Sequence, residues 1–267
     1  MTNVAAKTVL LLAATILLGG CFGSKVQLSE HERKISDLNE RALDSAAKGY
    51  ATDAQKLFQE ALQRAAAQDD RNGLSLTLLN QSRIARHDGK LQLAAQLVEQ
   101  ALANAGGTPQ YADAAQEKAL QELAANHLAE AGRWAGIALQ SEQGNLQGRR
   151  LNLLARIALI TGDKTEAMRL AETALTANKQ DGMELERANS LRMLGLLKAQ
   201  ERQFDKAEEL LQEALKLDKQ QEVSAKIAAD LETLAELAGL QDNKGLQQGY
   251  LQRARTVREH SKIISKQ

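Results

Sequence analysis

Apolar residues recur along the chain in a nine-residue pattern, Ala-x-x-Leu-x-x-x-Ala-Leu, which predicts a series of amphipathic helices. Residues at offsets 0, 3, 7 and 8 fall on one face of a helix, where they form an apolar stripe. Four clean copies occur, at Ala54–Leu62, Ala94–Leu102, Ala167–Leu175 and Ala207–Leu215. Two altered copies keep the spacing: Ala131–Leu139 has Trp134 in the leucine slot, and Gln247–Arg255 retains only Ala254.

The copies begin 36 to 40 residues apart, and this near-even spacing is typical of a repeat array. A small residue stands twelve positions before each copy: Ala42, Ser82, Ala119, Ala155, Gly195 and Ala235. Four residues further back, five of the six positions hold leucine. Because a small side chain lets two helix backbones approach closely, each repeat is predicted to be a helical hairpin whose second helix carries the nine-residue pattern.

Turn and breaker residues divide the array into six predicted hairpins. They span about 32–67, 73–103, 111–143, 148–177, 184–217 and 222–258. The strongest break, at 104–109, contains a Gly pair and the only proline of the chain, so no helix is expected to cross it. The last hairpin is expected to turn through a loop at 239–245.

The composition supports an almost entirely helical protein. Only 3% of the residues are aromatic, and alanine, leucine, glutamine and charged residues with good helix propensity are abundant. Thirty-four basic residues balance thirty-four acidic ones, so no net field would draw the protein onto nucleic acid.

No catalytic constellation stands out in the sequence. The four histidines lie far apart along the chain, and the single cysteine has no second thiol with which to share a metal. No glycine-rich loop has the form that cradles a phosphate, because Gly106-Gly107 lacks the lysine that would follow. We therefore predict a protein without enzymatic activity, cofactor or metal.

The amino-terminal segment is typical of a secretory signal peptide. Lys7 is followed by a short apolar run to Leu18 and then by two glycines and Cys21. The apolar run is shorter than the roughly 20 residues that span a bilayer. An ordinary signal peptide with a chance cysteine, or an uncleaved anchor, would also fit these residues.

The sequence Leu18-Gly19-Gly20-Cys21 resembles the bacterial lipobox. This resemblance implies cleavage before Cys21 and lipid on its thiol and on the new amino terminus. Phe22 stands where an Asp would mark retention in the inner membrane, so the resemblance favours the periplasmic face of the outer membrane. The predicted domains are a signal peptide at 1–20, a lipidated cysteine and tether at 21–30, and a repeat domain at 31–267.

The spacing of large, small and alanine positions resembles the tetratricopeptide repeat over about residues 32–258. Two features depart from that family: the repeats are longer than its 34 residues, and its proline is absent from them. The resemblance implies an all-α, right-handed α-α superhelix of about six helical hairpins. It also implies that the partners are other proteins or extended peptide segments.

In this family ligands usually meet the concave face, which the first helix of each hairpin lines. Carried over residue by residue, the family's inward positions supply seven candidate binding residues here: Arg83, Arg86, Arg149, Asn152, Arg156, Asn189 and Arg192. Arginine binds carboxylates through two parallel hydrogen bonds, and asparagine pairs with peptide groups. We expect an extended or C-terminal peptide of acidic character. Alternatively, these arginines solvate a helix face or pair with local acids.

The resemblances together predict a membrane-anchored periplasmic adaptor of a Gram-negative bacterium, which recruits cell-wall enzymes. A second interpretation is a pilotin-like factor that assembles an outer-membrane machine such as a type IV pilus secretin. A third class is an accessory subunit or cell-wall enzyme whose site no motif exposes. The client protein and the oligomeric state are not predicted.

Overall fold

The computed structural model describes residues 28–264, with side chains as far as residue 261. The predicted signal peptide and Cys21 lie outside the described residues. Within 28–264 the chain forms twelve α-helices: α1 (Glu30–Ala47), α2 (Ala51–Ala67), α3 (Arg71–His87), α4 (Leu91–Ala105), α5 (Tyr111–Ala124), α6 (Leu128–Gln140), α7 (Gln147–Ile160), α8 (Lys164–Gln180), α9 (Glu184–Gln200), α10 (Phe204–Gln220), α11 (Ser224–Leu240) and α12 (Lys244–Ile264). None of these helices is both long and apolar enough to cross a membrane.

Successive helices pack in pairs, so the six predicted hairpins are confirmed. No helix crosses residues 106–110, as the break around the proline predicts. The last turn is shorter than the predicted loop at 239–245, because α11 continues to Leu240 and α12 begins at Lys244. Asp242 adopts a φ of 60°, and this single left-handed residue lets three residues reverse the chain.

Each hairpin turn contains one residue in the left-handed region. Gly49, Gly89 and Gly162 take this position in three hairpins, with φ between 74° and 88°. Glycine accepts a positive φ without the Cβ clash that other residues meet. The third and fifth hairpins use Asn126 and Arg202 instead, which explains why no glycine marks their turns.

Small side chains allow the two helices of each hairpin to approach closely. All six small positions predicted from the spacing are buried, and so are the alanines at the eighth position of each nine-residue pattern. Gly195 on α9 shows how tight the crossing is. A Cβ added there would lie 2.7 Å from Leu211 Cγ and 3.3 Å from the carbonyl oxygen of Ala207 on α10.

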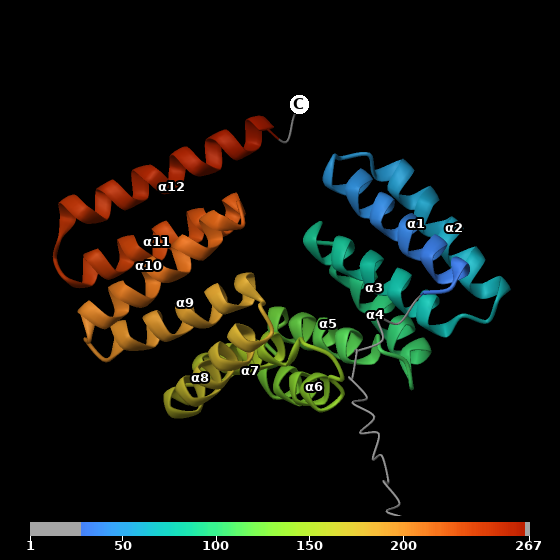
Figure 1. Cartoon of the computed structure of the whole chain (residues 1–267), viewed down its shortest axis with the longest axis horizontal. Helices are drawn as coiled ribbons and strands as arrows, with labels where there is room; N and C mark the ends of the chain where they lie inside the picture. Colours follow the sequence, from blue (N-terminus) through green and yellow to red (C-terminus); the bar gives the residue numbers. More distant parts are fainter. Residues whose placement is uncertain (1–27, 265–267) are drawn as a thin grey trace, which may run out of the picture.

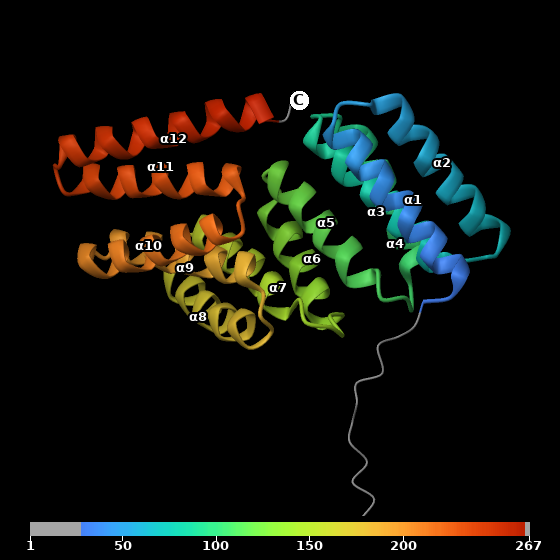
Figure 2. The same ribbon diagram turned by 45° about the horizontal axis from the view of Figure 1, so that its top comes forward.

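The hairpins follow one another around an arc that brings the end of α12 back toward the turn between α1 and α2 (Figures 1 and 2). Along this arc first helices pack against first helices: α1 on α3, α3 on α5, α7 on α9 and α9 on α11. The helices α5 and α7 do not pack to a comparable extent, so the joint between the third and fourth hairpins is the most open on this side.

We predict that Gly195→Ala lowers the free energy of unfolding by about 1–3 kcal/mol, because the added methyl group overpacks against Leu211. Gly136 on α6 has nothing within 4 Å of an added Cβ. The control Gly136→Ala should therefore raise stability by up to about 1 kcal/mol through helix propensity. Urea denaturation measures both; equal effects of the two substitutions would refute the tight crossing at Gly195.

Candidate binding groove

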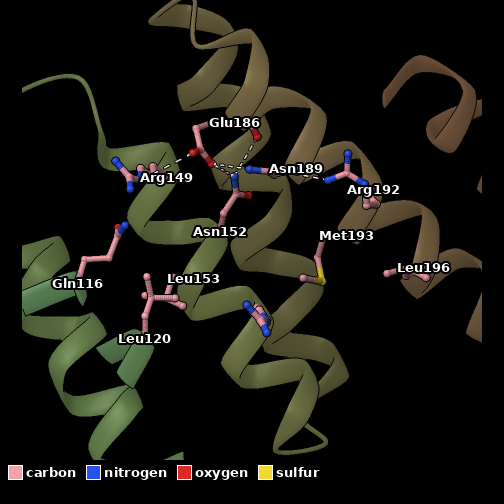
Figure 3. A pocket seen from close by; sticks show the side chains of 11 residues that line it. Gln116, Leu120, Arg149, Asn152, Leu153, Glu186, Asn189, Arg192, Met193 and Leu196 are labelled. Carbon is pink, nitrogen blue, oxygen red and sulfur yellow. Dashed lines mark hydrogen bonds and ion pairs between the residues drawn. The ribbon is translucent and has the colours of Figure 1, made fainter. Parts of the chain in front are cut away.

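A groove of about 390 Å³ opens on the side formed by first helices and spans α5, α7 and α9. Five of the seven predicted binding residues line it: Arg149, Asn152, Arg156, Asn189 and Arg192. Four apolar side chains also line it: Leu120, Leu153, Met193 and Leu196. The polar side chains form a row from Arg149 to Arg192, and the apolar ones lie along one side of that row (Figure 3).

Glu186 at the start of α9 organises the polar row (Figure 3). Its carboxylate accepts hydrogen bonds from Asn152 Nδ2 at 3.3 Å and from Asn189 Nδ2 at 2.9 Å. Arg149 Nε lies 3.8 Å from the same carboxylate. Asn152 also donates to the Glu186 carbonyl and accepts from Ser190, so this asparagine holds α7 to α9.

Two buried acids on the next two helices hold Arg192 in place. Its guanidinium donates to Asp218 on α10 and to Asp230 on α11, and both carboxyls are fully buried. Its Nη1 also donates to Asn189 Oδ1 at 2.9 Å, an oxygen that accepts from Lys226 Nζ at 2.8 Å as well. These contacts lock Arg192 in place and offset its charge.

Arg83 and Arg86 do not line the groove but lie on α3 against the acids of α5. Arg86 Nε donates to Glu117 at 2.6 Å, and Arg83 lies 3.6 Å from Asp113. Glu117 is 98% buried, so its carboxylate depends on these two arginines for compensation. Burial lowers the pKa of Arg83, although Asp113 and Glu117 partly offset the effect.

Arg150 was not among the predicted residues, yet it is the largest fully buried side chain in the described part of the chain. Its guanidinium donates to Gln116 at 2.6 Å, to Glu142 at 3.0 Å and to Asp113. Burial would raise the pKa of Asp113, but the charge and hydrogen bond of Arg150 outweigh it, so this pKa lies below its usual value. Arg150 thus clamps α5 to α7 at the joint where the helices themselves pack least.

The alternative interpretation, pairing with local acids, describes four of the five predicted arginines. Arg156 is the exception, because it is exposed and makes no hydrogen bond or ion pair to any described residue. Sequence reasoning missed the acids and Arg150 because it weighed inward positions one helix at a time. Asp113 and Glu117, spaced four apart on the first helix of the hairpin that follows that of Arg83, were the available signal.

The groove therefore offers one free guanidinium, one loosely held guanidinium at Arg149 and an apolar strip beside them. Such a surface suits a polypeptide segment that presents a carboxylate next to an apolar side chain. Within residues 28–264 no three metal-ligating side chains lie close enough together to hold a metal ion.

No family model matches the sequence, and no curated protein matches it. Solved structures do share its fold. A Rap protein complexed with competence and sporulation factor has a TM-score of 0.62 at 16% identity, over 85% of this chain and 66% of that one.

Two further structures match over most of their length. PilF of Pseudomonas aeruginosa has a TM-score of 0.61 at 15% identity, over 85% of this chain and 94% of that one. PilW, a widely conserved type IV pilus biogenesis factor, has a TM-score of 0.60 at 16% identity, over 81% of this chain and 90% of that one. At such low identity these matches show the fold alone, which is a TPR-like array of helical hairpins.

We predict that Arg150→Met lowers the free energy of unfolding by about 3 kcal/mol, because it leaves the carboxylates of Asp113 and Glu142 without their buried counter-charge. The control Arg169→Met removes an exposed pair with Glu166 and should cost less than about 1 kcal/mol. Chemical denaturation compares the two; a loss at Arg150 no larger than at Arg169 would contradict its role as a clamp.

Proposed function

We propose that this protein is a lipid-anchored periplasmic adaptor that binds an extended segment of another protein in the groove between α5, α7 and α9. The observation that carries this proposal is the exposed guanidinium of Arg156 beside an apolar strip, on a face where the other arginines are neutralised. A charge that no described residue pairs with, next to half-buried apolar side chains such as Leu120 and Met193, is suited to a partner.

The rigid floor of the groove supports the same proposal. Asn152 and Glu186 hold α7 against α9, and Glu186 also fixes Asn189, so these lining side chains are positioned before any partner arrives. A pre-organised site loses less conformational freedom on binding, and more of the contact energy contributes to affinity. The bound segment would lay a carboxylate on Arg156 and Arg149 and an apolar side chain on Leu153 and Met193.

Membrane attachment in this proposal rests on the sequence around Cys21. Lipid on the thiol and amino terminus would hold the repeat array near the outer membrane, where recruitment of cell-wall enzymes is the favoured role. Each buried CH₂ group contributes about 0.8 kcal/mol, so several acyl chains give stable anchoring. The likeness to PilW and PilF favours a second candidate, a pilotin-like factor in the assembly of an outer-membrane machine.

We predict that growth with a radiolabelled or clickable palmitate analogue labels the wild-type protein and fractionates it with outer membranes. Cys21→Ala should abolish labelling and release the protein from the membrane fraction, because no other cysteine is present to carry the thioether-linked lipid. Lipid labelling that persists in Cys21→Ala would overturn the anchor.

We predict that a photo-crosslinking residue in place of Leu196 in the groove captures a client, whereas one in place of Thr173 on α8 does not. A cell-wall enzyme among the captured proteins would support the first candidate, and a component of a pilus machine would support the second.

For the captured client, Arg156→Glu should weaken binding about tenfold or more, which corresponds to about 1.4 kcal/mol. Arg169→Glu, on a second helix, is the matched charge reversal and should leave affinity within about twofold. Circular dichroism shows that both variants are folded. Equal affinity of the wild type and Arg156→Glu for the client would show that the groove is not the binding site.

A further inference from the structure

Two buried carboxyl groups lie at the joint between the last two hairpins, and the hydrogen bonds around them do not satisfy all four of their oxygens. Asp218 on α10 and Asp230 on α11 both accept from one guanidinium, that of Arg192 on α9. The carboxyls are fully buried, and one oxygen of each, Asp218 Oδ1 and Asp230 Oδ2, has no hydrogen-bond partner among the described residues. Burying a carboxylate oxygen without a hydrogen-bond donor costs free energy of folding. Two such carboxylates side by side are therefore stable only when a donor, such as a bound proton, lies between them.

Two carboxyl groups that share one guanidinium are held close together. The Asp218 carboxyl is close enough to that of Asp230 to raise its pKa. When both are ionised they repel each other in a poorly solvated site, and the orphan oxygens have no donor. A single proton removes both problems, because the protonated carboxyl donates its O–H to the other carboxylate.

We propose that Asp218 and Asp230 take up one shared proton as the pH falls through the mildly acidic range, and that this proton strengthens the joint between the fifth and sixth hairpins. The contribution of this joint to the stability of the fold is therefore largest in acid and falls as the pH rises toward neutrality. The proton is taken from solvent and binds between the two orphan oxygens, while Arg192 keeps a hydrogen bond to each residue.

The charged groups around the pair agree with this assignment. On α9 the nearest are Arg192 and Glu186, on α10 Asp218, and on α11 Lys226 and Asp230. Burial and the neighbouring Asp218 carboxyl together raise the pKa of Asp230 to about 6, against the opposing effect of Arg192. Burial also lowers the pKa of Lys226, although the charges of Asp218, Glu186 and Asp230 partly offset the effect.

The direction of the effect follows from linkage. A carboxyl whose folded-state pKa lies above its unfolded value of 3.8 binds a proton more readily in the folded protein. Its contribution to stability is complete below the unfolded pKa and is lost as the pH rises through about 6. Between pH 7 and pH 5 one such proton lowers the unfolding equilibrium constant about tenfold. The groups with lowered pKa, such as Asp113, titrate below that window.

The test measures urea denaturation of the full-length protein in detergent at pH 7 and pH 5. The wild type should show the roughly tenfold fall in its unfolding constant. Asp230→Asn and Asp218→Asn each leave a neutral amide that donates to the remaining carboxylate, so each should abolish that pH-dependent gain. The matched control Asp205→Asn changes an exposed aspartate at the start of α10 and should keep the wild-type response.

Infrared difference spectra provide a readout that does not depend on folding energetics. The wild type should gain a protonated-carboxyl band between pH 7 and pH 5, and both buried-site variants should lack it. Absence of the band in the wild type, or the same pH response in the wild type and in both folded variants, would overturn the proposal. If neither variant folds, the wild-type band alone decides.

Protonation has a consequence for the groove, since Arg192 lines it. The cluster of Arg192, Asp218, Asp230 and Lys226 gains one unit of positive charge when the proton binds. Carboxylate ligands should therefore bind more tightly at pH 5 than at pH 7 at that end of the groove. This consequence rests on the proposed binding function, whereas the denaturation and infrared experiments do not.

Discussion

The close crossing of two helices inside each hairpin is the constraint on which the rest of the structure depends. Where Gly195 meets Leu211 and Ala207, the backbones lie too near to admit even a methyl group without a shift. The other five hairpins place alanine or serine at the equivalent position, and each of these residues is buried. Because every hairpin has a small, buried residue at its crossing, successive units present similar faces to one another, and stacking them produces a continuous arc rather than a globule.

Polar contacts between hairpins then determine how that arc is joined. Arg150 ties the fourth hairpin to the third, and Arg192 ties the fifth to the sixth, each through carboxylates that are largely or wholly buried. Such pairs add less net stability than an apolar contact of equal size, but losing one partner is costly, so they specify one arrangement of neighbouring repeats. The same contacts neutralise most of the arginines on the inner face and leave Arg156 as the free charge of the groove.

The location of the candidate groove was therefore predictable from the sequence, but the net charge of the residues that line it was not. The resemblance to the tetratricopeptide repeat put Arg149, Asn152, Arg156, Asn189 and Arg192 on one side of first helices, and the structure brings them together in one groove. Whether an arginine of the groove is neutralised depends on acids that are distant in the sequence. Asp218 and Asp230, which pair with Arg192, lie 26 and 38 residues from it. No local pattern reveals such pairings, because they arise from the angle between hairpins and from helices that meet only after folding.

By itself the sequence determined the number of hairpins, the helices that form them and the small residues at their crossings, because these follow from helical periodicity within 40 residues. It also located most of the turns between paired helices, whereas the positive φ of Asn126, Arg202 and Asp242 follows from the demands of hairpin closure. Only the tertiary structure decided that α5 and α7 stand apart, that Arg150 spans the gap, and that two buried acids face one arginine. Those features depend on the relative orientation of whole hairpins, which is set by the sum of many contacts and has no signature at any single position.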